Sequence, residues 1–244
     1  MKPLYSAAGL CIVFALMISS GRGAPAPKEK VEPLGPVTDE QLNTTVNNLK
    51  QIALAWHNYE SANGNFPSNE VGKGKKSLLS WRVQILPYIE EDTLYKQFKL
   101  DEPWDSEHNK KLIDKMPKIY APVRGKADAG MTFYQSFAGK NGLLKPGQKV
   151  SIVSVIDGTS NTFMVAEAAK PVIWTKPDDL VFDGKDVPAL GGMFDGKFHA
   201  AFCDGSVNRF RKGLNADLLG KLIDPADGHV IEREEAIDKD EEKK

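Results

Sequence analysis

A histidine and a cysteine near the end of the chain are the residue types that nucleophilic or metal chemistry uses. His199 and Cys203 stand four residues apart in a run with an extended pattern. At about 3.3 Å per residue, their backbones lie roughly 13 Å apart on a strand, so they cannot form a catalytic dyad or share a zinc ion. We therefore interpret them as a packed histidine and a buried thiol.

The segment from Gly158 to Thr162, which reads Gly-Thr-Ser-Asn-Thr, loosely matches the nucleophile elbow of serine hydrolases. That motif ends in a second glycine, where this chain has Thr162, and it joins a strand to a helix. The flanking runs here predict a turn between two strands. The side chains of Ser160 and Asn161 are therefore expected to bond the turn backbone, and we predict no catalytic residue and no enzyme activity.

Four aspartates crowd one predicted loop and could supply oxygen ligands to calcium, which takes six to eight of them. They are Asp178, Asp179, Asp183 and Asp186. Their spacing does not match an EF-hand, and Lys176 and Lys185 flank them with opposing charge. We interpret the four as solvated loop carboxylates and expect no cofactor, with a calcium site as the open alternative.

Four tryptophans could line a carbohydrate or peptide groove, because such sites combine aromatic faces with a few polar groups. They are Trp56, Trp81, Trp104 and Trp174. Packing in the core is the commoner fate of aromatic side chains, and we favour it here. His57 and His108 stand among polar residues on predicted helices, so we expect them to form local hydrogen bonds.

The element that must position most of these residues is a long helix near the start of the chain. Thr38 with Gln41 has the spacing of a capping box, and Asn63-Gly64 is a stop signal. Between them, apolar residues recur at helical spacing on one side: Leu42, Val46, Leu49, Ile52, Ala53, Trp56 and Tyr59. This pattern predicts an amphipathic surface helix packed on a core.

The second half of the chain has the pattern of strands joined by tight turns. Strands are predicted at 131–137, 150–156 and 162–166, and a hairpin at 198–203 and 206–210. Asp204-Gly205 predicts a two-residue type I′ turn in that hairpin. Asp92 is expected to cap a short helix in the middle of the chain, and Asn215 a last helix over 216–223. Together these elements predict an α+β domain with an antiparallel sheet.

Six separated strings then occur together in one order. They are 47–67, Ser80-Trp81-Arg82 with Leu86-Pro87-Tyr88, 100–109, Asp157 to Thr162, Trp174 to Leu180, and 202–207. This set resembles the family called domain of unknown function 1559 (DUF1559), which is abundant in planctomycete bacteria and related to type II secretion pseudopilins. The resemblance runs from about Leu42 to about Ile231. Its motif residues are Trp56, His57, Trp81, Trp104, Asp105, His108, Asp157, Gly158, Asn161, Trp174, Asp204 and Gly205.

The resemblance implies the globular head of a pseudopilin-like protein, in which calcium sites do occur. Many family members open with a prepilin leader and a long apolar anchoring helix. This chain instead begins with the pattern of a secretory signal peptide followed by a Pro-rich tether. Filament assembly is therefore not implied for it.

The first residues carry a positive charge on Lys2, then an apolar stretch from Leu4 to Ser20 and small residues up to Gly23. This order predicts a signal peptide over 1–23, with an uncleaved anchor as the alternative. Cleavage would leave Cys203 as the only thiol. We predict a tether over 24–37, a DUF1559-like α+β domain over 38–231 and a charged tail over 232–244.

Losing Lys2 and Arg22 with the signal leaves 30 basic against 33 acidic residues, a net charge of −3. No basic patch for nucleic acid is present. The sequence therefore predicts an exported, non-catalytic protein, periplasmic or secreted, that is not an integral membrane protein after cleavage. We expect it to act on an envelope or extracellular protein partner. The alternative is a soluble extracytoplasmic protein that binds a solute or carbohydrate.

Overall fold

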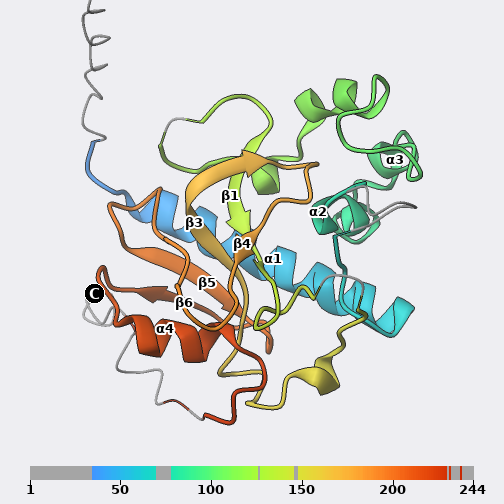
Figure 1. The fold of residues 1–244 in the computed structure, drawn as a ribbon. Helices are drawn as coiled ribbons and strands as arrows, with labels where there is room; N and C mark the ends of the chain where they lie inside the picture. The colour runs from blue at the N-terminus through green and yellow to red at the C-terminus, as the bar shows by residue number, and fades with distance from the viewer. Residues whose placement is uncertain are drawn as a thin grey trace, which may run out of the picture. The chain divides into compact units, whose positions relative to one another are not determined.

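The computed structural model describes residues 35–69, 78–125, 127–145, 148–229, 231 and 237 (Figure 1). The predicted signal peptide over 1–23 lies outside the described residues, as do the tether up to residue 34 and all of the predicted tail except Ile237. Their predicted boundaries remain predictions.

The long helix α1 (Asp39–Asn63) forms where the sequence predicts it. Gln41 donates its backbone N–H to the Thr38 hydroxyl at 3.2 Å, and the Thr38 N–H donates to the Gln41 side chain at 3.1 Å. The helix ends at Gly64, whose φ of 72° lets its N–H reach the Glu60 carbonyl at 2.7 Å. The capping box and the stop signal are both confirmed.

One side of α1 is buried against the rest of the domain. The buried residues are Thr45, Leu49, Ile52, Ala53, Ala55 and Trp56. Leu42, Val46 and Tyr59 lie at the half-buried margin of this side, whereas the side chain of Leu54 is 60% exposed. The amphipathic pattern is therefore confirmed, with Thr45 as a polar residue in the middle of the apolar face.

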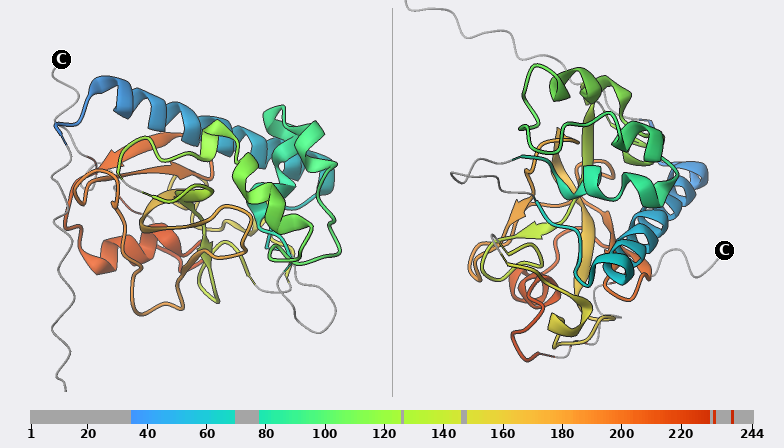
Figure 2. Two further views of the ribbon diagram at one scale, coloured as in Figure 1. Left: turned by 90° about the horizontal axis from the view of Figure 1, so that it is seen from above. Right: turned by 90° about the vertical axis from the view of Figure 1, so that its right-hand side faces the viewer.

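The main sheet has the strand order β1-β3-β5-β6, and every neighbouring pair is antiparallel. Its strands are β1 (Met131–Gln135), β3 (Phe163–Ile173), β5 (Phe198–Phe202) and β6 (Val207–Phe210). A small parallel pair adds β2 (Phe137–Ala138) and β4 (Leu180–Val181). Helix α1 crosses one face of the main sheet and α4 (Ala216–Ile223) lies on the other (Figure 2). The predicted α+β class is confirmed.

Side chains of β5 alternate between the two faces of the sheet, as the period of two requires. Phe198 and Phe202 pack in one apolar cluster with Leu222 of α4. Ala201 and Cys203 belong to the larger cluster beneath α1. His199 shares the parity of Ala201 and therefore points toward α1.

The middle of the chain consists of short helical turns, as predicted. They are α2 (Trp81–Gln84), η2 (Leu86–Ile89), α3 (Asp92–Tyr95), η3 (Asn109–Lys115) and η4 (Lys118–Tyr120). Helix α3 has Glu91 at the N-cap position and begins at Asp92, so the prediction that Asp92 is the capping residue is wrong by one position.

The predicted strand over 150–156 is wrong. This segment holds a single turn of 3₁₀ helix, η5 (Ile152–Ser154), and Ser151 and Ser154 bond each other's backbone across it. Such local side-chain bonds compete with strand pairing. Val153 is 84% exposed and Ile156 is 76% exposed, so the aliphatic pattern that suggested a strand does not reflect burial.

The predicted hairpin forms between β5 and β6, but its turn has three residues, 203–205, and not two. Gly205 donates its N–H to the Phe202 carbonyl at 2.9 Å and has a φ of 83°, whereas Asp204 lies outside the positive-φ region. A type I′ turn needs positive φ at both central residues. Gly205 instead supplies the single left-handed residue of a longer loop.

Candidate functional site

Asp179, one of the predicted loop carboxylates, lies inside the domain. Its Oδ1 accepts hydrogen bonds from Trp81 Nε1 at 3.0 Å, Arg82 Nη2 at 2.8 Å and the Ser136 N–H at 2.9 Å. Its Oδ2 accepts from Asn69 at 2.8 Å. The interpretation of Asp179 as a solvated carboxylate is therefore wrong, because four donors, one of them the Arg82 guanidinium, replace its water.

Arg82 is fully buried together with Asp179. Its Nε donates to the Tyr134 carbonyl at 2.9 Å, and its guanidinium carbon lies 4.6 Å from the centre of the Trp81 ring. The Tyr120 hydroxyl donates to the Arg82 carbonyl at 2.9 Å. Both members of the ion pair have side chains with no exposed surface. The pair therefore joins α2, β1 and the segment before β4, and it does not face a solute.

A second buried carboxylate, Glu167 of β3, joins the sheet to α1. Its Oε1 accepts from the Thr45 hydroxyl at 2.5 Å, and its Oε2 accepts from the backbone N–H of His199 at 2.8 Å. The Nδ1 of His199 lies 3.1 Å from the same Oε2. The Tyr134 hydroxyl lies 2.8 Å from the Thr45 hydroxyl, so Tyr134 connects this cluster to Arg82.

Burial perturbs the protonation of three groups in this interior. It raises the pKa of the Tyr134 phenol, and the nearby Glu167 carboxylate raises it further. Burial likewise raises the pKa of the Tyr120 phenol and of the Cys203 thiol. All three therefore stay neutral at physiological pH, and the thiol is not an activated nucleophile.

The predicted packing of His199 and Cys203 is confirmed, because both residues are fully buried. The His199 ring also makes an edge contact with Phe194, with ring centroids 5.2 Å apart. A histidine beside a carboxylate, as in His199 with Glu167, is a pair that enzymes use in catalysis. Because this pair is buried beneath α1, we interpret it as structural.

The four aspartates of the alternative calcium site are not brought together. Asp178 pairs with Lys176 at 2.6 Å, Asp183 accepts the Lys140 N–H at 2.9 Å, and Asp186 is exposed. Within the part of the chain that the structure describes, no group of three or more His, Cys, Asp or Glu residues could hold a metal ion.

Three of the four tryptophans belong to the core. Trp56, Trp81 and Trp174 have no exposed surface, and Trp174 packs between Phe98 and Tyr120. Trp104 is half-buried, with the Lys176 ammonium 5.9 Å from its ring centre. The tryptophans therefore do not form the aromatic groove that a carbohydrate-binding protein needs, and the solute-binding alternative is not favoured.

The motif residue Asp157 fixes a distant loop. Its carboxylate accepts the backbone N–H groups of Asp227 at 2.6 Å and Gly228 at 2.9 Å. The Pro225 carbonyl accepts in return from the N–H groups of Ile156 and Asp157, at 2.8 and 3.2 Å. The motif string that begins at Asp157 thus holds the 224–228 loop in place.

The other polar motif residues have local roles. Asn161 bonds the Asp157 carbonyl at 3.1 Å, and Asp204 accepts from the backbone and hydroxyl of Ser206. His108 is exposed and lies 2.8 Å from the Gln97 carbonyl. The predicted local bonding of His108 is confirmed. Asp105 is exposed. His57 is half-buried beside Phe66, and its Nε2 is buried without a hydrogen-bond partner among the described residues, so the predicted local bond is not observed at this atom.

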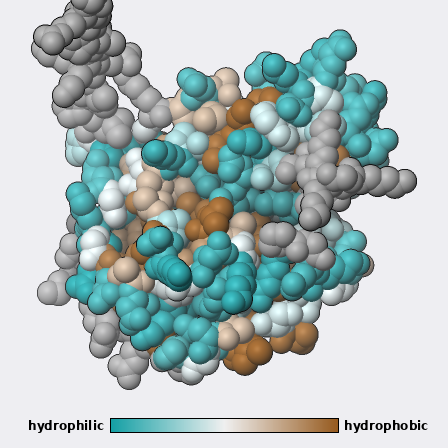
Figure 3. All heavy atoms as spheres, in the orientation of Figure 1, coloured by the Kyte–Doolittle hydropathy of each residue, from teal (hydrophilic) through white to brown (hydrophobic). Residues whose placement is uncertain are grey.

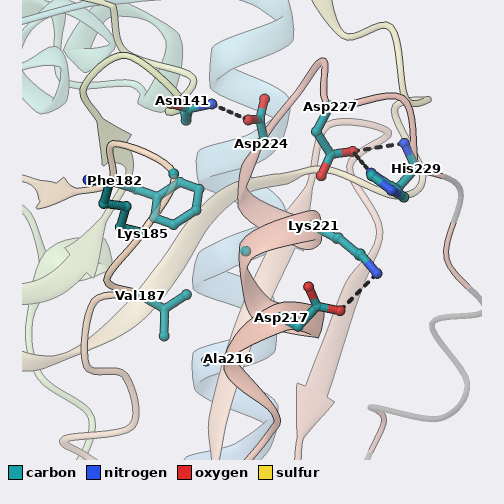
Figure 4. Close-up of a pocket in the computed structure, with 12 residues that line it drawn as sticks. Asn141, Phe182, Lys185, Val187, Ala216, Asp217, Lys221, Asp224, Asp227 and His229 are labelled. Carbon is teal, nitrogen blue, oxygen red and sulfur yellow. Dashed lines mark hydrogen bonds and ion pairs between the residues drawn. The ribbon is translucent and has the colours of Figure 1, made fainter.

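A pocket of about 380 Å³ opens between the loop after β4 and α4 (Figure 4). Three polar pairs surround it: Asn141 with Asp224 at 2.5 Å, His229 with Asp227 at 3.1 Å, and Lys221 with Asp217 at 2.8 Å. Lys221 lowers the pKa of Asp217, and Asp217 in turn raises that of Lys221. The rest of the lining is Phe182, Gly184, Lys185, Val187, Ala216 and Gly220.

Sequence reasoning missed this pocket because three separate segments build it and none carries a recognisable motif. The only available signals were Asp224-Pro225, which predicts the end of α4, and the Lys185 region of the acidic loop. Neither indicates that the two segments meet.

The fold defines an α+β protein in which α1 and α4 cover opposite faces of an antiparallel sheet, with polar clusters buried in the interior. The family described as "Protein of unknown function (DUF1559)" matches residues 44–123. The family predicted from the motifs is thereby confirmed over this part of the chain. No curated protein and no solved structure is found to match the chain. Among the described residues, no helix has the length and apolar character needed to cross a membrane.

Proposed function

We propose that this protein is exported and non-catalytic, and that it acts by binding another protein in the cell envelope or outside the cell. One observation carries the proposal. The side chains best suited to catalysis are buried and bonded in two pairs, Glu167 with His199 and Arg82 with Asp179. In contrast, a loop fixed at both ends exposes two aliphatic side chains to water.

These two side chains, Val153 and Ile156, form what we term the aliphatic tip. Figure 3 shows hydrophobic side chains at the lower edge of the molecule, where Figure 1 places the loop that carries η5. The loop is anchored at both ends, because the Val150 carbonyl accepts the Phe66 N–H at 2.7 Å and Ile156 donates to Pro225. A preorganised apolar projection loses little conformational entropy on binding, which favours recognition of a partner.

The export part of the proposal rests on the charged start, apolar stretch and small residues of 1–23. From the motif strings we also propose that the domain resembles the globular head of a pseudopilin. Cell fractionation after expression of the full-length chain tests export. Protein recovered from the periplasm or medium without residues 1–23 supports it. Recovery from the cytoplasm with residues 1–23 attached contradicts it.

Affinity purification from envelope and extracellular fractions, after cross-linking in intact cells, tests the interaction. A protein that co-purifies in stoichiometric amount and rebinds when purified supports the proposal. Broad activity profiling provides the opposing test: a turnover that is lost in a His199→Gln variant with unchanged stability would replace binding with catalysis.

A further inference from the structure

We infer that the pocket beside α4 and the aliphatic tip form one continuous surface that binds an extended peptide segment of the partner protein. The inference rests on the proposed function and names where the partner docks. The two features adjoin at Pro225, whose carbonyl accepts the Ile156 N–H at 2.8 Å. Asp224 and Asp227, on either side of this proline, line the pocket.

A glycine in the interior of α4 is the first sign that the pocket is kept open. Glycine within a helix lowers helix stability relative to alanine, so a glycine at this position needs an explanation. A Cβ built on Gly220 would meet only the Phe182 ring at 3.4 Å and Val187 at 4.0 Å, which are ordinary contacts. Packing therefore does not require glycine at this position. Its effect is to leave the floor of the pocket one methyl group deeper.

The second sign is that hydrogen bonds hold the 224–228 loop both from the pocket lining and from Asp157 outside it. Asp157 accepts the N–H groups of Asp227 and Gly228, and Asn141 and the Ala226 N–H both donate to Asp224. Because Asp157 bonds one part of this loop and Asn141 bonds another, the loop keeps its shape as a wall when the pocket is empty. Preformed pockets of a few hundred Å³ are typical of binding sites.

The lining indicates the chemical class of the ligand. Val187 and Ala216 contribute apolar atoms to the wall, while Lys185, Lys221 and Asp217 bring charges of both signs to the rim (Figure 4). An extended peptide matches this mixture, because its backbone offers a donor and an acceptor at each residue beside an apolar side chain. The aliphatic tip next to the rim can then cover a neighbouring apolar side chain of the same segment.

Two other ligand classes fit less well. A carbohydrate needs an open aromatic face, and the one aromatic lining residue, Phe182, is only 4% exposed. A lone cation needs free carboxylates, but Asp217, Asp224 and Asp227 each already bind a partner within the protein.

The probe for this surface is a displayed library of random linear peptides, selected on the immobilised full-length protein. The affinities of the enriched peptides are then measured by fluorescence polarisation against wild type, Ile156→Ser, Gly220→Ala and Leu54→Ser. Leu54 is the matched control, because it is also an exposed aliphatic residue, 60% exposed, and it lies on α1 across the sheet from α4. Thermal unfolding of each variant establishes that it is folded.

We expect Ile156→Ser and Gly220→Ala each to weaken binding by about tenfold, the size of effect typical of a central contact. Gly220→Ala should meanwhile raise the melting temperature, since alanine favours the helix, and Leu54→Ser should leave the affinity unchanged. Peptides that bind Ile156→Ser and Gly220→Ala as well as wild type would overturn the inference. So would a selection that enriches no peptide.

The same variants separate this inference from the proposed function. If a cross-linked partner is captured equally by wild type, Ile156→Ser and Gly220→Ala, the protein acts by interaction but through another surface. If these two variants lose the partner and Leu54→Ser keeps it, both the function and the surface are supported. If wild type captures no partner, the proposed function fails, whatever the peptides show.

Discussion

The hydroxyl of Thr45 lies 2.5 Å from Oε1 of Glu167, although 122 residues separate the two along the chain. Through this contact, a polar residue on the apolar face of α1 binds a charged side chain of the sheet. Apolar packing alone is non-directional, whereas a buried carboxylate needs its donors at fixed positions. The contact therefore selects one placement of α1 on the sheet among those that would bury the same apolar surface.

Replacing Thr45 by valine keeps the shape of the side chain but removes its hydroxyl. Glu167 then loses a donor and Tyr134 loses its nearest hydroxyl partner, in an interior that water does not reach. We expect the free energy of unfolding to fall by about 1–3 kcal/mol, as measured by urea denaturation. Thr44 is the matched control, since its hydroxyl bonds only the Glu40 carbonyl on the exposed side of α1. Equal losses for Thr44→Val and Thr45→Val would contradict this account.

The substitution Asp179→Asn removes the charge that compensates Arg82. Because both side chains are fully buried, the guanidinium would remain in the interior without a counter-ion. Breaking a buried pair in this way costs about 3–5 kcal/mol, which should appear as a large loss in the urea midpoint. The neighbouring substitution Asp178→Asn breaks a half-exposed pair with Lys176 and should cost less than about 1 kcal/mol. A reversed order of the two losses would show that Asp179 is not the structural carboxylate.

Added calcium provides a direct test of the acidic loop. A ligand that binds only the folded state raises the melting temperature. At a hundredfold excess over Kd it adds about 2.7 kcal/mol to the free energy of unfolding. Asp179 already accepts four hydrogen bonds from the protein, and Asp178 pairs with Lys176. We therefore expect millimolar calcium to leave the melting temperature unchanged. A rise that magnesium does not reproduce and that Asp183→Asn removes would establish a calcium site in this loop.

The pH dependence of stability should reveal the burial of Cys203. Burial raises the pKa of its thiol above the ordinary value of 9.0, so the unfolded chain releases this proton first as the pH rises. The stabilisation is complete below the ordinary pKa and declines above it, and the free energy of unfolding should therefore fall above about pH 9. Urea denaturation between about pH 8 and pH 10 should show a shallower fall for Cys203→Ala than for wild type. Identical slopes would place the thiol in contact with water.

The sequence by itself determined the elements whose signals are local. Helix α1 was predictable because Thr38, Gln41 and Gly64 specify its ends and apolar residues repeat at the helical period between them. Helix α4 was predictable for the same reason, with Asn215 bonding the Asp217 N–H at its start. The strand spacing of His199 and Cys203 was enough to predict that they pack and do not react together, and the motif strings were enough to predict the DUF1559 family.

Tertiary structure decided which polar residues are buried, because desolvation depends on what covers a side chain and not on its neighbours in sequence. Asp179 stands among loop carboxylates in the sequence, yet its partner Arg82 is 97 residues away and encloses it. Val153 and Ile156 show the reverse, since their aliphatic types predicted a buried strand and no other element covers them. The pocket beside α4 likewise depends on tertiary contacts, because Asp157 bonds the backbone of a loop 70 residues further along the chain that forms part of the lining.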